Sequence, residues 1–516
     1  MNHEVHVEIE RKYDVDDTVS VPDLSGVSSI AQVSEPETAT LQAVYYDTDR
    51  LDLASQRIVL RRRVGGADEG WHIKLPGDEG RLELHWPLGE ESPIPAAVLD
   101  LVLVHVRDRE LSPVARLTTT RTTFCLFDAD GLGLAEVADD LVSAVDETTG
   151  LLRVWREWEV ELTDNAPGSP KKREALLDAI EKRLAEVGAT PSKSISKLAH
   201  ALGREKLGET PPRWSLRSKS TAGEVLREAV SALTDRLKSA DPDVRQDEAD
   251  SVHAMRSSIR RLRSVFATYR PILASTAAAH LESELAALGV VLGDARDPQV
   301  MHDRARNLVR SQSNRKMHDA VLSRLVGSKD DEYHKALNYL HVIMSSPRYF
   351  RLLDDLEAFA ASAKFNSSSE KPAAKALARG IAHDYARVKK RMAAVNDAAN
   401  PAEWQERIHA VRKAARRLRF GVEAVTSGDT AIFGDRARRL AQAAERVQDS
   451  LGEYRDSVLL QHLLVESSEL AFAAGENTFG YGRLHALEQQ RADYAIEEYS
   501  RARGEFKIAK KWVPQR

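Results

Sequence analysis

The chain of 516 residues contains a single cysteine, Cys125, and no apolar segment approaching the roughly 20 residues that span a membrane. One cysteine excludes intrachain disulfides and metal sites built from several thiolates. The first residues lack the basic stretch followed by an apolar stretch that is typical of a signal peptide, so we expect a cytoplasmic protein with no membrane partner. Hydrophobic residues make up 42% and charged residues 30%, as in globular proteins, and the length predicts two or three domains.

The net charge of −5 conceals two regions of opposite charge. Residues 221–516 contain 47 Lys and Arg against 40 Asp and Glu, whereas residues 1–220 contain 27 against 39. Between them, residues 203–220 contain Gly, Pro-Pro and Ser, which break any regular period and predict a linker. We therefore expect one domain at 1–202 and another at 221–512, with different electrostatic roles.

Residues 1–202 are predicted to be mostly β-strands. Runs such as "QAVYYDT", "RIVLRRRV" and "VWREWEVEL" are short, rich in β-branched or aromatic residues, and separated by Gly, Asp or Pro. Helices are predicted near 96–107, 170–187 and 192–202, and the second has Ser169 and Pro170 at its start.

Charged residues alternate along several of these strands. Within "HVEIERKYDV" (6–15), Glu8, Glu10 and Lys12 share one face. The same alternation recurs at Arg61 and Arg63, at His72 and Lys74, at Arg81, Glu83 and His85, and at Glu157, Glu159 and Glu161. One such strand would normally expose its charges to water, but the recurrence predicts a barrel with a polar lumen. Carboxylates there could hold Mg²⁺ or Mn²⁺, and cationic side chains could bind phosphate oxygens.

Residues 221–512 are predicted to be helical, and they contain an internal repeat. "VHAMRSSIRRLRSVFATYRP" (252–271) aligns with "IHAVRKAARRLRFGVEAV" (408–425). In the same order, "LGDARDPQV" (292–300) is matched by "LGEYRDSVL" (451–459). The repeat predicts two similar helical halves related by pseudo-symmetry.

Each copy of the first motif places a row of basic residues on one helix face. His253, Arg256, Arg260 and Arg263 fall within about 80° of arc. His409, Arg412, Arg416 and Arg419 repeat this spacing, and Lys413 and Arg417 widen the second face. No acid lies between His253 and Arg263 or between His409 and Arg419, so each row needs an anion or acids from elsewhere, unless it is simply solvated.

Arginine forks form paired hydrogen bonds with phosphates, so a row of them suits a linear polyanion. Nucleic acid fits the charge as well, but these stretches lack interleaved aromatic residues for stacking bases. Inorganic polyphosphate therefore matches better than nucleic acid.

The pattern HxxRxxxRRLR, present twice together with LGxxRD, resembles the CHAD domain, a conserved-histidine α-helical domain. The resemblance implies two pseudo-symmetric four-helix bundles that bind inorganic polyphosphate. By position, it implies binding through His253, Arg256, Arg260, Arg263, His409, Arg412, Lys413, Arg416, Arg417 and Arg419.

"EIERK" (8–12) fits the ExExK signature of the CYTH superfamily, the triphosphate tunnel metalloenzymes. "YYDT", "LRRR", "WHIKLP", "RLE", "WREWEVEL" and "SKSISKL" follow in the order of that family. The resemblance implies an α+β domain built on an antiparallel β-barrel tunnel. It implies Mg²⁺ or Mn²⁺ on Glu8, Glu10, Glu157, Glu159 and Glu161, with Lys12 also catalytic. It implies substrate binding by Lys12, Arg61, Arg63, Lys74, Arg81, Arg121 and Lys197.

Together the two resemblances predict a metal-dependent hydrolase of a triphosphate-containing small molecule, coupled to a polyphosphate-binding module that associates with polyphosphate granules. The alternative is a binding protein whose tunnel does not catalyse. Glu136, Ala138 and Asp140 share a strand face, and the sequence leaves open which acid corresponds to a family ligand. His85 stands where a further acid is common in the family.

Overall fold

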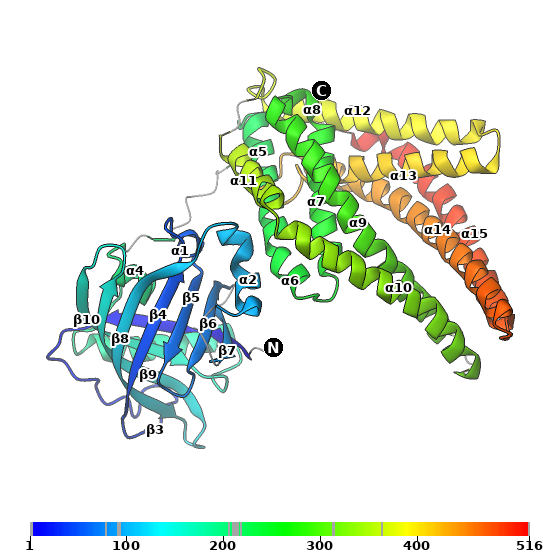
Figure 1. The fold of residues 1–516 in the computed structure, drawn as a ribbon. Coiled ribbons are helices and arrows are strands. Elements are labelled where there is room, and N and C mark those ends of the chain that lie inside the picture. The colour runs from blue at the N-terminus through cyan, green and yellow to red at the C-terminus, as the bar shows by residue number, and fades with distance from the viewer. Residues whose placement is uncertain are drawn as a thin grey trace. The chain divides into compact units, whose positions relative to one another are not determined.

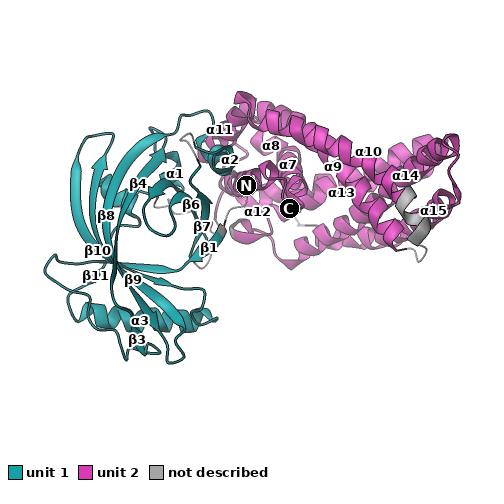
Figure 2. Cartoon of the chain, turned by 60° about the horizontal axis from the view of Figure 1, so that its bottom comes forward, with its two compact units in different colours: residues 1–213 teal, residues 214–516 magenta. Residues whose placement is uncertain are grey.

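The structure is a computed structural model that describes residues 4–77, 80–89, 94–204, 207–208, 216, 219–311, 315–362 and 365–513. The chain forms two compact units, residues 1–213 and 214–516 (Figure 2). Positions 205–206, 209–215 and 217–218 of the predicted linker lie outside the described residues. Within the described part of the chain, no helix combines the length and apolar character needed to cross a membrane.

In its described residues, the first unit is an antiparallel sheet with four helices. Its strands are β1 (Glu4–Glu8), β2 (Glu10–Asp14), β3 (Gln32–Val33), β4 (Glu37–Asp47), β5 (Val59–Val64), β6 (Gly70–Pro76), β7 (Arg81–Pro87), β8 (Ser112–Phe127), β9 (Gly133–Asp146), β10 (Leu152–Leu162) and β11 (Thr190–Pro191). Its helices are α1 (Asp52–Ser55), α2 (Ala96–Val106), α3 (Pro170–Ala185) and α4 (Lys197–Ala201). The helix predicted at 170–187 begins at Pro170 as expected, and Ser169 caps it by accepting a hydrogen bond from the Lys172 backbone N–H.

The sheet curls because its two ends are joined by one residue. The strand order is β1-β7-β6-β5-β4-β8-β9-β10-β2-β11, and Ile9 alone separates β1 from β2. The single strand predicted at 6–15 is therefore two strands, with β1 at one edge of the sheet and β2 beside β11 at the other edge. The Ile9 carbonyl accepts a hydrogen bond of 2.9 Å from the Leu162 backbone N–H. Consecutive residues thus bring both ends together, and the curled sheet confirms the predicted tunnel architecture (Figure 1).

Apolar residues of the strands pack on the outside of the sheet, against the helices. Leu60 and Ile73 share one core with Val98 of α2, and Trp158 shares another with Ile180 of α3. Because strand side chains alternate between faces, the residues between these apolar positions point into the lumen. This alternation positions the charged residues of the candidate site.

The second unit is helical. It comprises α5 (Ala222–Ser239), α6 (Asp241–Arg245), α7 (Ser251–Thr268), α8 (Arg270–Leu273), α9 (Thr276–Arg310), α10 (Arg315–Met344), α11 (Pro347–Ser362), α12 (Ala373–Ala394), α13 (Pro401–Glu423), α14 (Asp435–Ala473) and α15 (Phe479–Ile508). Short 3₁₀ turns are η1 (Val395–Asp397), η2 (Gly428–Thr430) and η3 (Ala509–Trp512).

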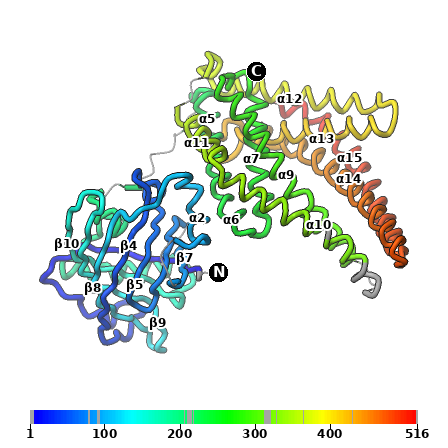
Figure 3. The backbone as a smooth tube through the Cα atoms, viewed as in Figure 1, coloured from blue at the N-terminus to red at the C-terminus, as the bar shows by residue number. Residues whose placement is uncertain are grey.

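The two halves of this unit begin at α5 and α12, and they confirm the predicted pair of bundles. The first repeated motif lies on α7 and α13, which pack against each other, and the second lies on α9 and α14. The long helices α14 and α15 run side by side (Figure 3). Several hydrogen bonds tie the halves together, and two of them are buried. The Thr268 hydroxyl donates to buried Asp384 at 2.7 Å, and the Tyr269 hydroxyl donates to the Gly421 carbonyl at 2.6 Å.

Candidate functional site

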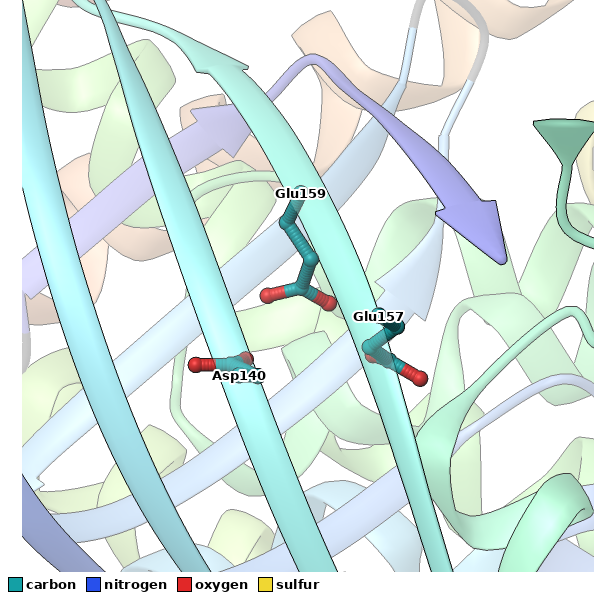
Figure 4. A group of neighbouring side chains, drawn as sticks. All are labelled: Asp140, Glu157 and Glu159. Carbon is teal, nitrogen blue, oxygen red and sulfur yellow. The ribbon is translucent and has the colours of Figure 1, made fainter. Parts of the chain in front are cut away.

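Three buried carboxylates converge on the lumen of the β unit. Asp140 lies on β9, and Glu157 and Glu159 lie on the neighbouring strand β10 (Figure 4). Asp140 stands directly opposite Glu157 in the sheet register. One oxygen from each side chain lies within 4.8 Å of the others. A compact set of carboxylate oxygens is a donor set that hard divalent cations prefer.

Cationic side chains surround these carboxylates. The Lys197 ammonium lies 2.9 Å from Asp140, 2.7 Å from Glu157 and 2.6 Å from Glu159. Arg121 forms a bidentate pair with Asp140 and a 2.6 Å hydrogen bond with Glu159, which also contacts Lys12. Burial alone would raise the pKa of Glu159, but Lys12, Lys197 and Arg121 hold it well below its ordinary value. Glu159 is therefore ionised at neutral pH.

A second charged group faces the lumen from β1, β6 and β7. Glu8 accepts a hydrogen bond from Lys74 through one oxygen, and its other oxygen is buried with no hydrogen-bond partner among the described residues. Glu83 lies 2.8 Å from His72 Nδ1, 3.3 Å from Lys74 and 3.4 Å from Arg61. Burial would raise the pKa of Glu83, but Lys74, His72 and Arg61 together lower it. The unpartnered oxygen of Glu8 marks a position where a ligand would satisfy the carboxylate.

The lumen forms a cavity of about 260 Å³, and the described residues lining it include seven Lys or Arg and five Asp or Glu. The lining brings together all of the predicted substrate-binding residues: Lys12, Arg61, Arg63, Lys74, Arg81, Arg121 and Lys197. Burial and then Glu8 raise the pKa of Glu161 to about 7, so this carboxyl titrates near neutral pH. Burial, then Arg61 and Arg121, lower the pKa of Arg63 to about 9, which reflects crowding of positive charge.

The predicted acids are distributed over the cavity. Glu157 and Glu159 belong to the buried cluster, whereas Glu8 pairs with Lys74, and Glu10 lies 2.9 Å from Lys12. Glu161 lies 3.5 Å from His6.

Asp140 and Glu83 were absent from the predicted site. The alternation of Glu136, Ala138 and Asp140 along one strand face indicated that Asp140 could point into the lumen. Selecting Asp140 required the register that places it beside both Glu157 and Arg121.

In the helical unit, six side chains from two packed helices form what we call the basic cluster. Its members are His253, Arg256 and Arg260 of α7 and His409, Arg412 and Arg416 of α13. Burial, followed by Arg256, Arg416 and Arg412, lowers the pKa of Arg260 to about 9. Burial, followed by Arg412, Arg256 and Arg263, lowers the pKa of Arg416 to about 10. Arginines from both helices therefore repel one another across the helix pair.

The two repeated motifs of each half meet at an arginine. A Cβ added to Gly293 would lie 3.3 Å from the Arg256 guanidinium, and one added to Gly452 would lie 3.4 Å from that of Arg412. The glycine in each "LG" pair thus lies beside the arginine of the preceding motif. In the first half, Asp297 of the "RD" pair also accepts a 2.7 Å hydrogen bond from Arg256. The two motifs therefore lie side by side in each half.

Arg417 and Arg419, two further residues predicted to bind polyphosphate, are also paired with acids. Arg417 donates to Asp384 at 2.8 Å. Arg419 lies 2.7 Å from Glu423 and 2.6 Å from Glu445. These acids come from beyond the motif or from other helices, so the spacing within the motif could not reveal them. Lys413 is exposed.

The histidines of the basic cluster are neutral at neutral pH. Burial, then Lys413 and Arg455, lower the pKa of His409 to about 4. Burial and then Arg296 lower the pKa of His253. A bound anion would raise both values, because it stabilises the imidazolium form.

Comparisons with known proteins agree with this geometry. Residues 6–200 match the model of the CYTH domain, and residues 228–465 match that of the CHAD domain. An uncharacterized protein of Mycobacterium tuberculosis strain H37Rv, Rv2226, is 35% identical over 512 residues, covering 96% of each chain. PptA from Streptomyces chartreusis is 17% identical, with a TM-score of 0.45, over 55% of this chain and 99% of its own. The CHAD domain from Ricinus communis is 18% identical, with a TM-score of 0.41, over 59% and 96%. The chain belongs to the family of proteins in which a CYTH domain is followed by a CHAD domain.

Proposed function

We propose that the chain is a metal-dependent phosphohydrolase that cleaves a triphosphate or polyphosphate in the lumen of the β unit and binds inorganic polyphosphate through the basic cluster. The CYTH and CHAD matches support a triphosphate-related function. The observation that carries the hydrolase proposal is the buried cluster of Asp140, Glu157 and Glu159, of which Glu159 lines a cavity together with lysines and arginines. Such a protein would concentrate at cytoplasmic polyphosphate granules.

The residues fit Mg²⁺ or Mn²⁺. Asp140, Glu157 and Glu159 would hold the ion through carboxylate oxygens, and the Lys197 ammonium, within 2.9 Å of all three, demonstrates that one cation can contact them together. The unpartnered oxygen of Glu8 is a further donor on the lumen. When bound, the metal would supply positive charge to the phosphate oxygens and activate water for attack.

The cationic side chains of the lumen would bind and orient the substrate. Arg61, Arg63 and Lys74 would contact phosphate oxygens, since each projects into the cavity. A bound phosphate would relieve the crowding that lowers the pKa of Arg63. The carboxylates of the lumen largely balance its cations, so a triphosphate would bind more strongly with a divalent cation than alone.

The basic cluster would bind polyphosphate with less compensation, although Arg256 donates to Asp297 at 2.7 Å. Arg256, Arg260, Arg412 and Arg416 lie on two packed helices, and Arg256 and Arg412 lower the pKa values of Arg260 and Arg416. A linear polyanion would relieve this repulsion, which is a physical reason for binding. We leave Arg417 and Arg419 out of the proposed contacts because acids already neutralise them.

The hydrolase proposal is tested by phosphate release from tripolyphosphate, nucleoside triphosphates and thiamine triphosphate with Mg²⁺ or Mn²⁺. We expect release by the natural chain, and a loss of at least about 100-fold on Glu157→Gln/Glu159→Gln, since electrostatic groups at reacting centres contribute this much. Glu147→Gln is the matched control, because Glu147 forms an ion pair with the exposed Arg116. Failure to release phosphate from every substrate would eliminate the hydrolase.

The polyphosphate proposal is tested by retention of the protein on immobilised polyphosphate. Arg412→Ala/Arg416→Ala should elute at lower salt than the natural chain, because binding of polyanions depends on the number of paired cations. Retention at unchanged strength would show that the basic cluster is not the binding site.

A second candidate is a polyphosphate-binding protein whose lumen does not catalyse. The observation that favours it is Lys197, which already forms ion pairs with all three buried carboxylates, as in a structural ion-pair network. Binding of Mn²⁺, followed by electron paramagnetic resonance, separates the candidates. The hydrolase requires Mn²⁺ binding that is lost in Glu157→Gln/Glu159→Gln, and the binding protein does not.

A further inference from the structure

The two halves of the helical unit differ at one end of the basic cluster. In the aligned repeat, Trp404 and Gln405 correspond to Glu248 and Ala249, and Tyr454 in "LGEYRD" corresponds to Ala295 in "LGDARD". The helix α13 begins at Pro401, eight residues before His409, whereas α7 begins two residues before His253. The second half therefore repeats the phosphate-binding residues and adds two aromatic side chains and an amide.

These additional side chains line an open pocket of about 650 Å³. The rings of Trp404 and Tyr454 meet edge to face, with their centroids 5.5 Å apart. Both residues are partly exposed, Gln405 is exposed, and Asn396 and Asn400 also line the pocket. The volume lies in the range of small-molecule sites. Aromatic faces with amide groups beside them suit a nucleobase, which stacks through its ring and forms hydrogen bonds along its edge.

The pocket is continuous with the basic cluster along α13. Gln405, His409, Arg412 and Arg416 follow spacings of four, three and four residues, which place them within about 60° of arc on the helix. On α14, Tyr454 directly precedes Arg455, whose charge acts on both His409 and Arg412. A phosphate chain lying on Arg412 and Arg416 would therefore lead toward the aromatic pair.

We propose that the second half of the helical unit binds a nucleoside polyphosphate. Its phosphates lie on His409, Arg412 and Arg416, and its base lies against Trp404 and Tyr454. This inference rests on the proposed phosphate binding by the basic cluster, and it adds a ligand class to that cluster. Inorganic polyphosphate has no base, so it would leave the aromatic pocket unused.

The test compares ATP with tripolyphosphate as competitors for fluorescently labelled long-chain polyphosphate on the full chain, with EDTA present to prevent hydrolysis. Both competitors carry a triphosphate, so the base and ribose make the difference between them. We expect Trp404→Ala to raise the ATP concentration for half displacement by about 5- to 100-fold, because stacking contributes this much. The tripolyphosphate concentration for half displacement should not change.

Three variants make the outcome specific. Trp404→Phe retains a ring and should retain most of the preference for ATP, which separates loss of stacking from misfolding. Tyr339→Ala removes an aromatic residue that is 55% exposed on α10 and should change neither competitor. If Trp404→Ala changes the half-displacement concentrations of both competitors equally, or of neither, the proposed nucleobase pocket is refuted. The proposed polyphosphate binding by the basic cluster would be unaffected by that result. If Arg412→Ala/Arg416→Ala does not weaken the labelled polyphosphate, the basic cluster fails and the inference fails with it.

Discussion

Neutralising Arg416 should stabilise the helical unit and weaken its binding of polyphosphate. Arg416 lies on α13 among Arg412, Arg256 and Arg263, and together with burial these neighbours lower its pKa from the ordinary 12.5 to about 10. The charged side chain therefore opposes folding when no anion is bound. Replacement by methionine keeps an apolar stem of similar length and removes the charge.

The expected gain follows from this pKa. At about 1.4 kcal/mol per pKa unit, the lowering corresponds to on the order of 3 kcal/mol against the charged folded form. Water around this partly exposed side chain reduces the effect, so we expect Arg416→Met to raise the free energy of unfolding by about 1–2 kcal/mol. The cost of the charge is fully present below the folded pKa of about 10 and is relieved only as the pH rises through it. Measurements at pH 7 therefore report all of it.

The assay is urea unfolding at low ionic strength, followed by far-ultraviolet circular dichroism, which the helical unit dominates. Arg419→Met is the matched control, because Arg419 lies one turn further along α13 and is already paired with Glu423 and Glu445. Its removal should destabilise the unit and leave polyphosphate affinity nearly unchanged. Added polyphosphate should stabilise the natural chain more than Arg416→Met. A variant Arg416→Met that is less stable than the natural chain would refute the view that these arginines repel one another.

Three further outcomes are expected. Polyphosphate should bind more tightly as the pH falls from 8 to 5, because burial and neighbouring cations lower the pKa of His409 to about 4 in the free protein, whereas a bound anion raises it. This gain in affinity is lost as the pH rises through the pKa of His409 in the complex. Binding by His409→Gln, measured over the same pH range, should depend less on pH. EDTA should abolish phosphate release, and Mn²⁺ should restore it. In thermal melts, Mn²⁺ should raise the unfolding midpoint of the natural chain but not that of Glu157→Gln/Glu159→Gln. Gly421→Ala should destabilise the helical unit by about 1–3 kcal/mol in urea unfolding, because its Cβ would lie 2.6 Å from the Thr268 hydroxyl oxygen.

Local patterns in the sequence predicted the architecture because each depends on a short-range rule. Alternation predicted the strands of the curled sheet, and Ser169 followed by Pro170 predicted the start of α3. The repeat predicted two helical halves. The sequence did not predict the division of residues 6–15 into two strands. The alternation continues through Ile9, although β1 pairs with β7 and β2 pairs with β10.

The candidate site was harder to predict because it depends on contacts between distant elements. Asp140 joins Glu157 only through the register of β9 and β10. Similarly, Arg417 pairs with Asp384, which lies 33 residues earlier in the chain and outside the motif. The basic stretches have no interleaved aromatic residues, yet Trp404 precedes its motif and Tyr454 comes from the other motif, so their meeting required the packing of α13 against α14.

The two phosphate sites proposed for this chain differ in their charge balance, and this difference accounts for different roles. In the lumen of the β unit, Lys197 and Arg121 are each paired with carboxylates, so little net positive charge remains to hold a triphosphate unless a metal ion adds its own. In the basic cluster, Arg260 and Arg416 are crowded by like charges, and a bound anion would relieve this repulsion. In a site whose charges are balanced, a cationic side chain can release a carboxylate to bind a phosphate during a reaction and pair with the carboxylate again afterwards. A site whose charges are unbalanced gains most when its ligand stays bound. The first arrangement suits turnover of a substrate, and the second suits retention of a long polyanion.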